Sequence, residues 1–169
     1  MSFIYRKATP GDIPSIMEME ALSLKHPWSE SDINSLMNPP TEVAGKIAIV
    51  AQQDETPIAY IGASYVCDEC EIGNVCTHPS YRRMGAAKGL FDELISICKE
   101  QSIEKIFLEV SSTNEAAIAL YKSIGFVQYN IRPNYYGSGD DALLFVYNLY
   151  LIFTENCEIL NTAKLIKFF

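Results

Sequence analysis

The chain has 169 residues, of which 49% are hydrophobic and 20% are charged. This length and composition predict one globular domain with a sizeable core and exclude an intrinsically disordered chain. Acidic side chains outnumber basic ones by 21 to 13, and the net charge of −8 argues against nucleic acid as the main partner and favours a basic peptide or an amine.

The sequence carries neither a membrane-spanning nor an export pattern. No apolar run approaches the ~20 residues that cross a bilayer, and the N-terminal segment lacks the apolar core of a signal peptide. We therefore expect a cytoplasmic protein that binds no membrane. The five cysteines are read as reduced thiols, and the C-x-x-C pair Cys67 and Cys70 as part of a hairpin turn instead of a zinc or redox centre, so no metal is expected.

The N-terminal part predicts a short strand at residues 4–6 and then a helix. Thr9 precedes a proline and lies three residues before Asp12, which is the pattern of a capped helix start. Apolar residues at helical spacing follow as far as about residue 25.

A second short helix is predicted around residues 32–37. Ser29 is its expected N-cap, and Asp32 is the capping partner. Trp28, the only tryptophan, lies in the turn before this helix. Its indole either anchors the turn in the core or lines a groove for an acceptor, and the core is the more common place.

Three strands are predicted next, at residues 46–52, 57–66 and 71–77. The last of them leads into the most informative stretch of the chain. There Arg82 to Ala87 reads R-x-x-G-x-A and is followed by an amphipathic helix, whose apolar residues return to one face as far as Cys98.

A helix that opens on a basic, glycine-containing turn is suited to bind phosphate. Its first backbone N–H groups have no partner within the helix, and the positive end of the helix dipole lies beside them. Arg82, Arg83 and Lys88 add positive charge, while Gly85 keeps the turn small. The pattern is neither GxxxxGK[ST] nor GxGxxG. The alternative reading is an ordinary strand-to-helix connection with solvated arginines.

This loop resembles the diphosphate-binding loop of the GNAT acetyltransferases, Q/R-x-x-G-x-G/A, which holds acetyl-coenzyme A. Ala87 stands at the last position, where the family pattern allows glycine or alanine. The resemblance implies that acetyl-CoA is the cosubstrate.

The C-terminal part alternates strands and helices. A strand at residues 104–110 follows the crossover helix and should therefore run parallel to the strand at 71–77. Asn114 is the expected N-cap of a helix that ends at Gly125. Further elements are strands at residues 126–132 and 142–149, with a loop at 133–140 between them.

Three polar residues should converge with the phosphate loop, because open sheets bind ligands beyond the carboxyl ends of parallel strands. Glu109 lies at such an end, Asn114 follows it, and Tyr121 lies about two helical turns further on. The carboxylate suits a base for the attacking amine, and the phenol suits a proton donor to the leaving thiolate. A backbone N–H within residues 75–77 can polarise the thioester carbonyl.

Each of these residues also has an ordinary explanation. Glutamates at strand ends are commonly solvated or ion-paired, tyrosines commonly pack, and Asn114 is explained as a cap. Cys76 suggests a route through an acyl-cysteine, but the sequence offers it no base partner.

Four separated segments are similar, in order, to the RimI type of GNAT enzymes, which acetylate the N-terminal alanine of a ribosomal protein. They are HPWSE (26–30), HPSYRRMGAA (78–87), LEVSSTNEAAIALYKSIGF (108–126) and RPNYYGSGDDA (132–142). The similarity spans roughly residues 3–149. It implies an α/β (mixed α+β) GNAT fold: a mixed, mostly antiparallel sheet of six to seven strands, splayed between the fourth and fifth and flanked by about four helices.

The same resemblance implies roles for individual residues. Glu109 would be the general base and Tyr121 the general acid. Trp28, Tyr135 and Tyr136 would line the groove for the peptide N-terminus. The residues that would contact acetyl-CoA, including Arg82 of the loop, are Val75, Cys76, Thr77, Arg82, Arg83, Met84, Gly85, Ala86, Ala87, Lys88 and Asn114.

The chain departs from the RimI pattern at a few positions. Ser111 replaces an arginine of the family, and Asp140-Asp141 stands for its Glu-Asp. We expect residues 1–150 to form the single acetyltransferase domain and 151–169 to be a C-terminal extension of unknown role. These departures leave the coenzyme prediction intact and bear on the acceptor.

The sequence therefore predicts an acetyl-CoA-dependent N-acetyltransferase that acts on the N-terminal α-amine of a protein. The acceptor suggested by the resemblance is a small-subunit ribosomal protein, which is basic. One alternative is transfer to a small amine or to a broader set of N-termini. Another is a non-catalytic module that binds acetyl-CoA; the presence of both Glu109 and Tyr121 favours an enzyme.

Overall fold

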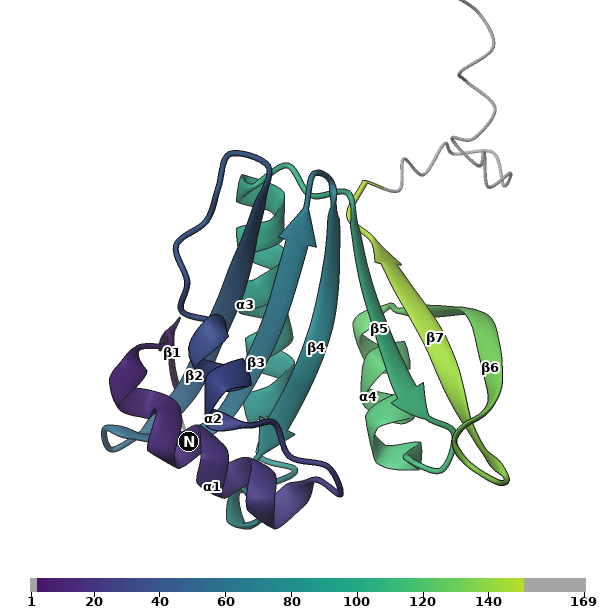
Figure 1. Ribbon diagram of the computed structural model, residues 1–169, viewed down its shortest axis with the longest axis horizontal. Helices are drawn as coiled ribbons and strands as arrows, with labels where there is room; N and C mark the ends of the chain where they lie inside the picture. Colours follow the sequence, from purple (N-terminus) through teal and green to yellow (C-terminus); the bar gives the residue numbers. More distant parts are fainter. Residues whose placement is uncertain (1–2, 151–169) are drawn as a thin grey trace, which may run out of the picture.

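The computed structural model describes residues 3–150. In this part of the chain a seven-stranded sheet has the order β1-β2-β3-β4-β5-β7-β6, with helices on both faces (Figure 1). The strands are β1 (Ile4–Lys7), β2 (Ala44–Gln53), β3 (Thr56–Val66), β4 (Glu69–Thr77), β5 (Lys105–Ser111), β6 (Val127–Gly137) and β7 (Asp140–Asn148). The helices are α1 (Ile13–Ser23), α2 (Glu30–Ser35), α3 (Ala86–Glu100) and α4 (Glu115–Ile124), with 3-10 turns at Pro10–Asp12 and Pro79–Tyr81. The predicted mixed α/β GNAT fold is confirmed.

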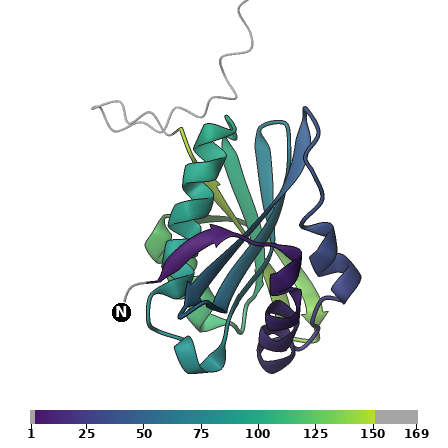
Figure 2. The same cartoon turned by 90° about the vertical axis from the view of Figure 1, so that its left-hand side faces the viewer.

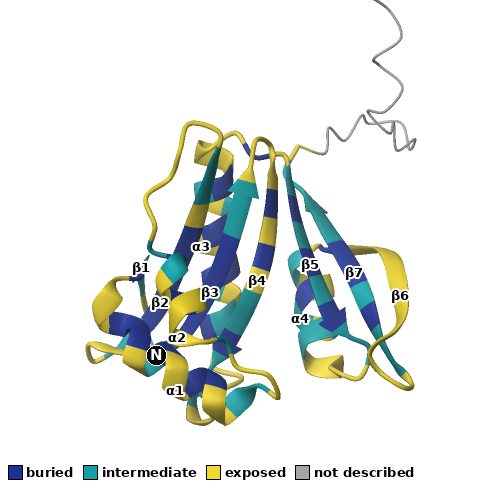
Figure 3. Ribbon diagram, viewed as in Figure 1, coloured by how far each residue is buried: buried dark blue, intermediate teal, exposed yellow. Residues whose placement is uncertain are grey.

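The two pairs of helices cover opposite faces of the sheet (Figure 2). Ile16 of α1 and Ile33 of α2 belong to one core cluster, and Phe91 of α3 and Tyr121 of α4 to the other. The centres of β2 and β3 are buried at consecutive residues, so both faces of the sheet are covered there (Figure 3). Along β5 buried residues alternate with partly exposed ones, and β6 is exposed, so this end of the sheet is packed mainly on one face.

The sheet opens between β4 and β5. The two strands are parallel, as expected, but they pair only where Glu69–Glu71 lies beside Lys105–Phe107. Beyond these residues they diverge (Figure 1). The register of β4 against β3 shifts at the same level, so that Gly73 is an extra residue between the pairs Ala63–Ile72 and Gly62–Asn74. Such a bulge bends a strand and increases its twist, which turns β4 away from β5.

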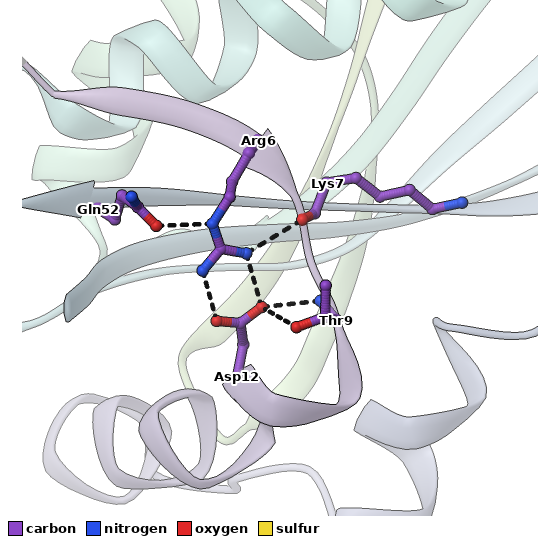
Figure 4. A network of polar contacts seen from close by, with 5 residues as sticks. All are labelled: Arg6, Lys7, Thr9, Asp12 and Gln52. Atoms are coloured by element: carbon purple, nitrogen blue, oxygen red, sulfur yellow. Dashed lines mark hydrogen bonds and ion pairs between the residues drawn. The ribbon is translucent and has the colours of Figure 1, made fainter. Parts of the chain in front are cut away.

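The predicted helix caps are present. The Ser29 hydroxyl accepts a hydrogen bond from the Asp32 backbone N–H, and the Ser29 backbone N–H donates to the Asp32 carboxylate in return. At Thr9 the backbone N–H and the hydroxyl both donate to the Asp12 carboxylate. The sequence did not indicate that Asp12 also binds Arg6 of β1, at 2.7 and 2.8 Å (Figure 4). The Arg6 guanidinium, the largest influence, lowers the pKa of the buried Asp12 carboxyl to about 2. The network fixes β1 to the start of α1.

The predicted loop at residues 133–140 is wrong for all but two of its residues, because 133–137 belong to β6 and Asp140 begins β7. Strand β6 continues to Gly137, and only Ser138 and Gly139 separate it from β7. Polar side chains replace part of the regular ladder there, because the Asn134 backbone N–H donates to Asp141 and the Gly139 N–H donates to Asn134, both at 2.8 Å. Pro133 and Asn134, residue types that are typical of loops, led to the loop prediction for this irregular strand.

Three smaller expectations concern the cysteine pair, membrane-spanning helices and the C-terminal extension. Cys67 lies in the two-residue turn between β3 and β4, as expected, whereas Cys70 is buried within β4. None of the helices among residues 3–150 is both long and apolar enough to cross a membrane. The predicted extension at 151–169 lies outside the described residues.

Candidate active site

A cavity of about 730 Å³ opens where β4 and β5 separate. It is bounded by the end of β4, the turn before α3 and the start of α4. All but one of the residues predicted to contact the coenzyme line it: Val75, Cys76, Thr77, Arg82, Arg83, Gly85, Ala86, Ala87, Lys88 and Asn114. Met84, the remaining one, is exposed and is not part of the lining. The sequence motif therefore lies at the opening between β4 and β5.

The turn before α3 directs backbone N–H groups at this cavity. Arg83 and Gly85 have φ values of 61° and 89°, in the left-handed region, and Gly85 is the N-cap of the helix. The first helical bond runs from the Gly89 N–H to the Gly85 carbonyl at 3.2 Å, so the N–H groups of the preceding turn point out of the helix end. A Cβ on Gly85 would meet no atom within 4 Å. Glycine is needed there for its backbone conformation.

The start of α4 supplies the other wall. The Asn114 side-chain oxygen accepts a bond from the Ala117 N–H at 3.2 Å, so the residue caps the helix as predicted and leaves its amide group for a ligand. Ala116, Ala117 and Ala119 line the cavity beside it. The sequence analysis missed these alanines, although their repetition in EAAIAL is a visible signal of a helix face that another group approaches closely.

Tyr121 lies deep in the cavity wall. Its ring is buried among Phe91, Phe126 and Phe145, with ring centroids 5.6 to 6.3 Å away. Within the described residues its hydroxyl has no hydrogen-bond partner. Burial raises the pKa of Tyr121 to about 12, and the nearby Tyr136 adds to the shift. The phenol is therefore protonated at neutral pH and faces the cavity as a donor.

Glu109 lies on the opposite face of β5 from Tyr121. Leu108 and Val110 are buried against the helices, and the two-residue period of the strand points Glu109 the other way. One carboxylate oxygen accepts a bond from Arg132 at 2.9 Å, and the other is 3.5 Å from the Tyr136 hydroxyl. Glu109 is not part of the cavity lining. The two predicted catalytic groups thus reach the opening of the sheet from different sides.

The three residues predicted to line the acceptor groove lie on the Glu109 side or beside β4. Tyr135 and Tyr136 are exposed and stack edge to face at 5.0 Å, with Arg132 over the Tyr135 ring. The indole of Trp28 covers Gly73 of β4, where an added Cβ would lie 2.6 Å from the ring. Trp28 therefore lies beside β4 and the tyrosine pair lies on β6, and none of the three lines the cavity.

Cys76 is buried and its thiol is engaged. The Sγ–H donates to the Met19 carbonyl at 3.3 Å. Burial, as the main cause, raises the pKa of this thiol. A nucleophilic cysteine needs a lowered pKa, so the geometry disfavours an acyl-cysteine route.

Sequence comparison matches residues 13–126 to the acetyltransferase (GNAT) family. The chain belongs to the GNAT family. It is therefore an N-acetyltransferase of the acyltransferase class, and the family uses acetyl-CoA.

Individual relatives of this GNAT chain are similar over most of their length. The [ribosomal protein bS18]-alanine N-acetyltransferase of Escherichia coli strain K12 is 32% identical over 136 residues, which are 79% of this chain and 88% of that protein. The enzyme of the same name from Haemophilus ducreyi is 31% identical over 144 residues, covering 83% and 94%.

Solved structures agree. The ribosomal-protein-S18-alanine N-acetyltransferase from Escherichia coli superposes with a TM-score of 0.80 at 27% identity, covering 93% of this chain and 99% of that one. Ard1 from Thermoplasma volcanium superposes with a TM-score of 0.79 at 28% identity, covering 89% and 99%. The sequence match and the superposed structures thus agree on the family and the fold.

Proposed function

We propose that this GNAT enzyme transfers the acetyl group of acetyl-CoA to the N-terminal α-amine of a protein, most simply a basic ribosomal protein whose first residue is alanine. The observation that carries the proposal is the opening of the sheet, which has a basic backbone cradle on one side and the Glu109 carboxylate with aromatic side chains on the other. The bS18-alanine enzymes named above support the choice of acceptor.

The diphosphate would bind the turn before α3. The free N–H groups after Gly85 and the side chains of Arg82, Arg83 and Lys88 offer hydrogen bonds and positive charge at one place. Past Glu71, β4 has no pairing with β5, so its facing edge carries backbone groups that a sheet partner would otherwise satisfy. The amides of the pantetheine arm have the chemistry to pair with that edge.

The reaction needs little from the protein beyond positioning and two proton transfers. The neutral amine attacks the thioester carbon, the carbon–sulfur bond breaks, and the acetyl group passes to nitrogen. A backbone N–H of Val75, Cys76 or Thr77 would stabilise the negative charge on the carbonyl oxygen. Because an α-amine has a pKa near ~8, its deprotonation is a modest task.

Glu109 would take the proton from the amine, directly or through water, and Tyr121 would donate to the departing sulfur. With its pKa raised to about 12, Tyr121 is a weak acid towards a solvated thiolate. The same burial disfavours the charged thiolate, which brings the proton affinities of the two groups closer. Tyr121 therefore acts first as a hydrogen-bond donor to sulfur.

The acceptor can be tested with N-terminal peptides. Peptides that begin with alanine, serine or methionine, each followed by either basic or acidic residues, would be incubated with the enzyme and acetyl-CoA and read by tandem mass spectrometry. We expect acetylation of the α-amine, with preference for alanine and for basic sequences, because the chain carries −8 net charge. Transfer only to lysine side chains or to small amines would contradict the proposal.

A further inference from the structure

The carboxylate of Glu20 is fully buried on the inner face of α1 and joins three other segments. It accepts hydrogen bonds from the backbone N–H of Trp28 at 2.5 Å, from the Asn74 side-chain amide at 2.6 Å and from the Tyr60 hydroxyl. A carboxylate costs free energy to bury unless its oxygens are hydrogen-bonded. Here all three partners are donors, and a carboxylate offers acceptors only.

These bonds converge on the bulge where β4 turns away from β5. Asn74 lies next to the extra residue Gly73 and directly before Val75, the first β4 residue of the cavity lining. The Trp28 indole covers Gly73 itself. Glu20 therefore binds β4 at its bulge, through Asn74, and also binds the turn that carries Trp28, whose indole packs on the same bulge.

Other contacts of α1 follow the same half of β4. The Met19 carbonyl accepts the Cys76 thiol, and the Ser23 hydroxyl lies 3.5 Å from the Thr77 carbonyl. Of these α1 residues, Glu20 is the one that also reaches the turn carrying Trp28. It thus connects the turn that carries Trp28, a predicted residue of the acceptor groove, with the half of β4 that lines the cavity.

We propose that Glu20 is a positioning residue: its buried carboxylate fixes the distance between the Trp28 turn and the splayed half of β4, and so aligns the acceptor amine with the thioester. The proposal rests on the proposed function and on the prediction that Trp28 lines the acceptor groove. Glu20 itself touches no substrate, because it is fully buried. Its effect is on alignment, to which group transfer is sensitive.

The chemistry of the network allows a sharp substitution. Glu20→Gln keeps the size of the side chain but replaces one acceptor oxygen with an NH₂ donor. That donor then faces either the Trp28 N–H, which cannot accept it, or the Asn74 amide and the Tyr60 hydroxyl, which can accept it only after reversing their own orientation. In either case the charge-assisted tie of the carboxylate is lost. Adding Asn74→Asp reverses the polarity of the second tie, so the new glutamine amide donates to the new aspartate while its oxygen still accepts from Trp28.

The position of the turn can be read directly, because Trp28 is the only tryptophan. The experiment compares the wild type, Glu20→Gln, the Glu20→Gln/Asn74→Asp pair and the control Glu18→Gln, which makes the same change at an exposed position of α1. Three quantities are measured: acrylamide quenching of Trp28, kcat and KM for an alanine-initiated peptide, and the Kd of acetyl-CoA by calorimetry.

We expect Glu20→Gln to raise the quenching constant about twofold and to lower kcat/KM for the peptide about tenfold, with the Kd of acetyl-CoA changed less than about threefold, because the tie is lost while the phosphate cradle is untouched. The double variant should recover both values, and Glu18→Gln should match the wild type. If Glu20→Gln does not fold, Tyr60→Phe removes one donor from the same carboxylate and should change quenching and kcat/KM in the same direction.

Native quenching and native kcat/KM in Glu20→Gln would overturn the proposal. So would an equal loss of peptide turnover and acetyl-CoA binding, since a general loosening of the fold affects both. If the wild type acetylates no N-terminal peptide, the proposed function fails instead; the quenching comparison, which needs no acceptor, then still decides whether Glu20 fixes the Trp28 turn.

Discussion

The two sides of the splay are built in different ways. On the side of α3 and α4, the cavity is made of backbone N–H groups, small residues, three basic side chains and one buried tyrosine. Two short stretches, Arg82 to Lys88 and Asn114 to Tyr121, supply most of its lining. On the other side, Glu109, Arg132 and Tyr136 come from strands β5 and β6 and hold one another through side chains. A site that binds through backbone N–H groups keeps its ligand contacts when side chains are substituted. A site that binds through paired charged side chains changes its specificity with every substitution of one of those side chains. The first therefore suits a cosubstrate common to the family, and the second suits an acceptor that varies.

The largest expected effect is on the backbone side. Gly85→Glu places a bulky anion at the N-terminus of α3 and forces a residue with a side chain into a φ of 89°. We expect the Kd of acetyl-CoA, measured by calorimetry, to rise more than about 100-fold because of like-charge repulsion at the diphosphate site.

A matched control makes this result specific. Gly139→Glu introduces the same residue at another positive φ, in the turn between β6 and β7, where a Cβ also meets open space. It should leave acetyl-CoA affinity within about threefold of the wild type, because only the strain is shared. Equal losses in the two variants would assign the effect to strain and remove the loop from the coenzyme site.

The second largest effect is expected from removing the hydroxyl of the buried Tyr121. Tyr121→Phe should lower kcat about 10- to 100-fold with little change in the Kd of acetyl-CoA, because the hydroxyl acts on the leaving sulfur and the ring still packs. Pre-steady-state acetyl transfer and calorimetry separate the two quantities. Tyr147→Phe, whose ring packs on Phe126 on the same side of β7, is the control and should keep full kcat; unchanged turnover in Tyr121→Phe would exclude the acid role.

A smaller loss of activity is expected from a change at Glu109, which is ion-paired with Arg132. Glu109→Gln should lower kcat/KM about tenfold at neutral pH, and the loss should grow as the pH falls, because a larger share of the amine is then protonated and needs a base. A pH profile of kcat/KM checks this. Glu104→Gln changes an exposed glutamate just before β5 and should follow the wild-type profile. A loss of equal size at every pH would indicate that Glu109 acts only through its ion pair with Arg132.

The smallest effect lies away from both sides of the splay. Arg6→Met removes the partner of Asp12, whose pKa is about 2 in the folded chain against an ordinary 3.8. Because the folded pKa is the lower one, this stabilisation is present above about pH 4 and is lost as the pH falls towards 2. We expect a loss of about 1 to 2 kcal/mol at pH 7 after allowing for solvent screening of Arg6.

Urea unfolding at pH 7 and at pH 2.5 tests this prediction. The difference between Arg6→Met and the wild type should shrink at the lower pH, and kcat should be retained. Lys7→Met changes a neighbouring side chain that is not bonded to Asp12 and keeps the backbone carbonyl that accepts from Arg6, so it should cost less at pH 7. A pH-independent difference would mean that Arg6 contributes packing alone.

The features that the sequence predicted correctly depend on residues a few positions apart. The capping pairs of α1 and α2, the Asn114 and Gly125 ends of α4 and the turn before α3 are all local, and local chemistry determines them. Ten of the cavity residues could be predicted for the same reason, because most of them lie in one loop and the helix start that follows it.

The features that the sequence could not supply depend on strand register. Glu109 meets Arg132 only because β7 lies between β5 and β6, and Glu20 meets Asn74 across 54 positions of the chain. The continuation of β6 to Gly137 likewise requires Asp141 to lie opposite Asn134. A pattern of apolar residues specifies which face of a strand is buried, but not which polar residues of different strands become neighbours.

The short contact between β4 and β5 has a mechanical consequence. Three residue pairs join the β1–β4 part of the sheet to the β5–β7 part, so the backbone bonds between these two halves are few compared with those inside each half. A ligand that binds between β4 and β5 and forms bonds with both strands would hold the two parts of the sheet together. Saturating acetyl-CoA should therefore slow amide hydrogen exchange along both β4 and β5, including at positions remote from the ligand. The cosubstrate would then stabilise the fold itself, and only while it is bound.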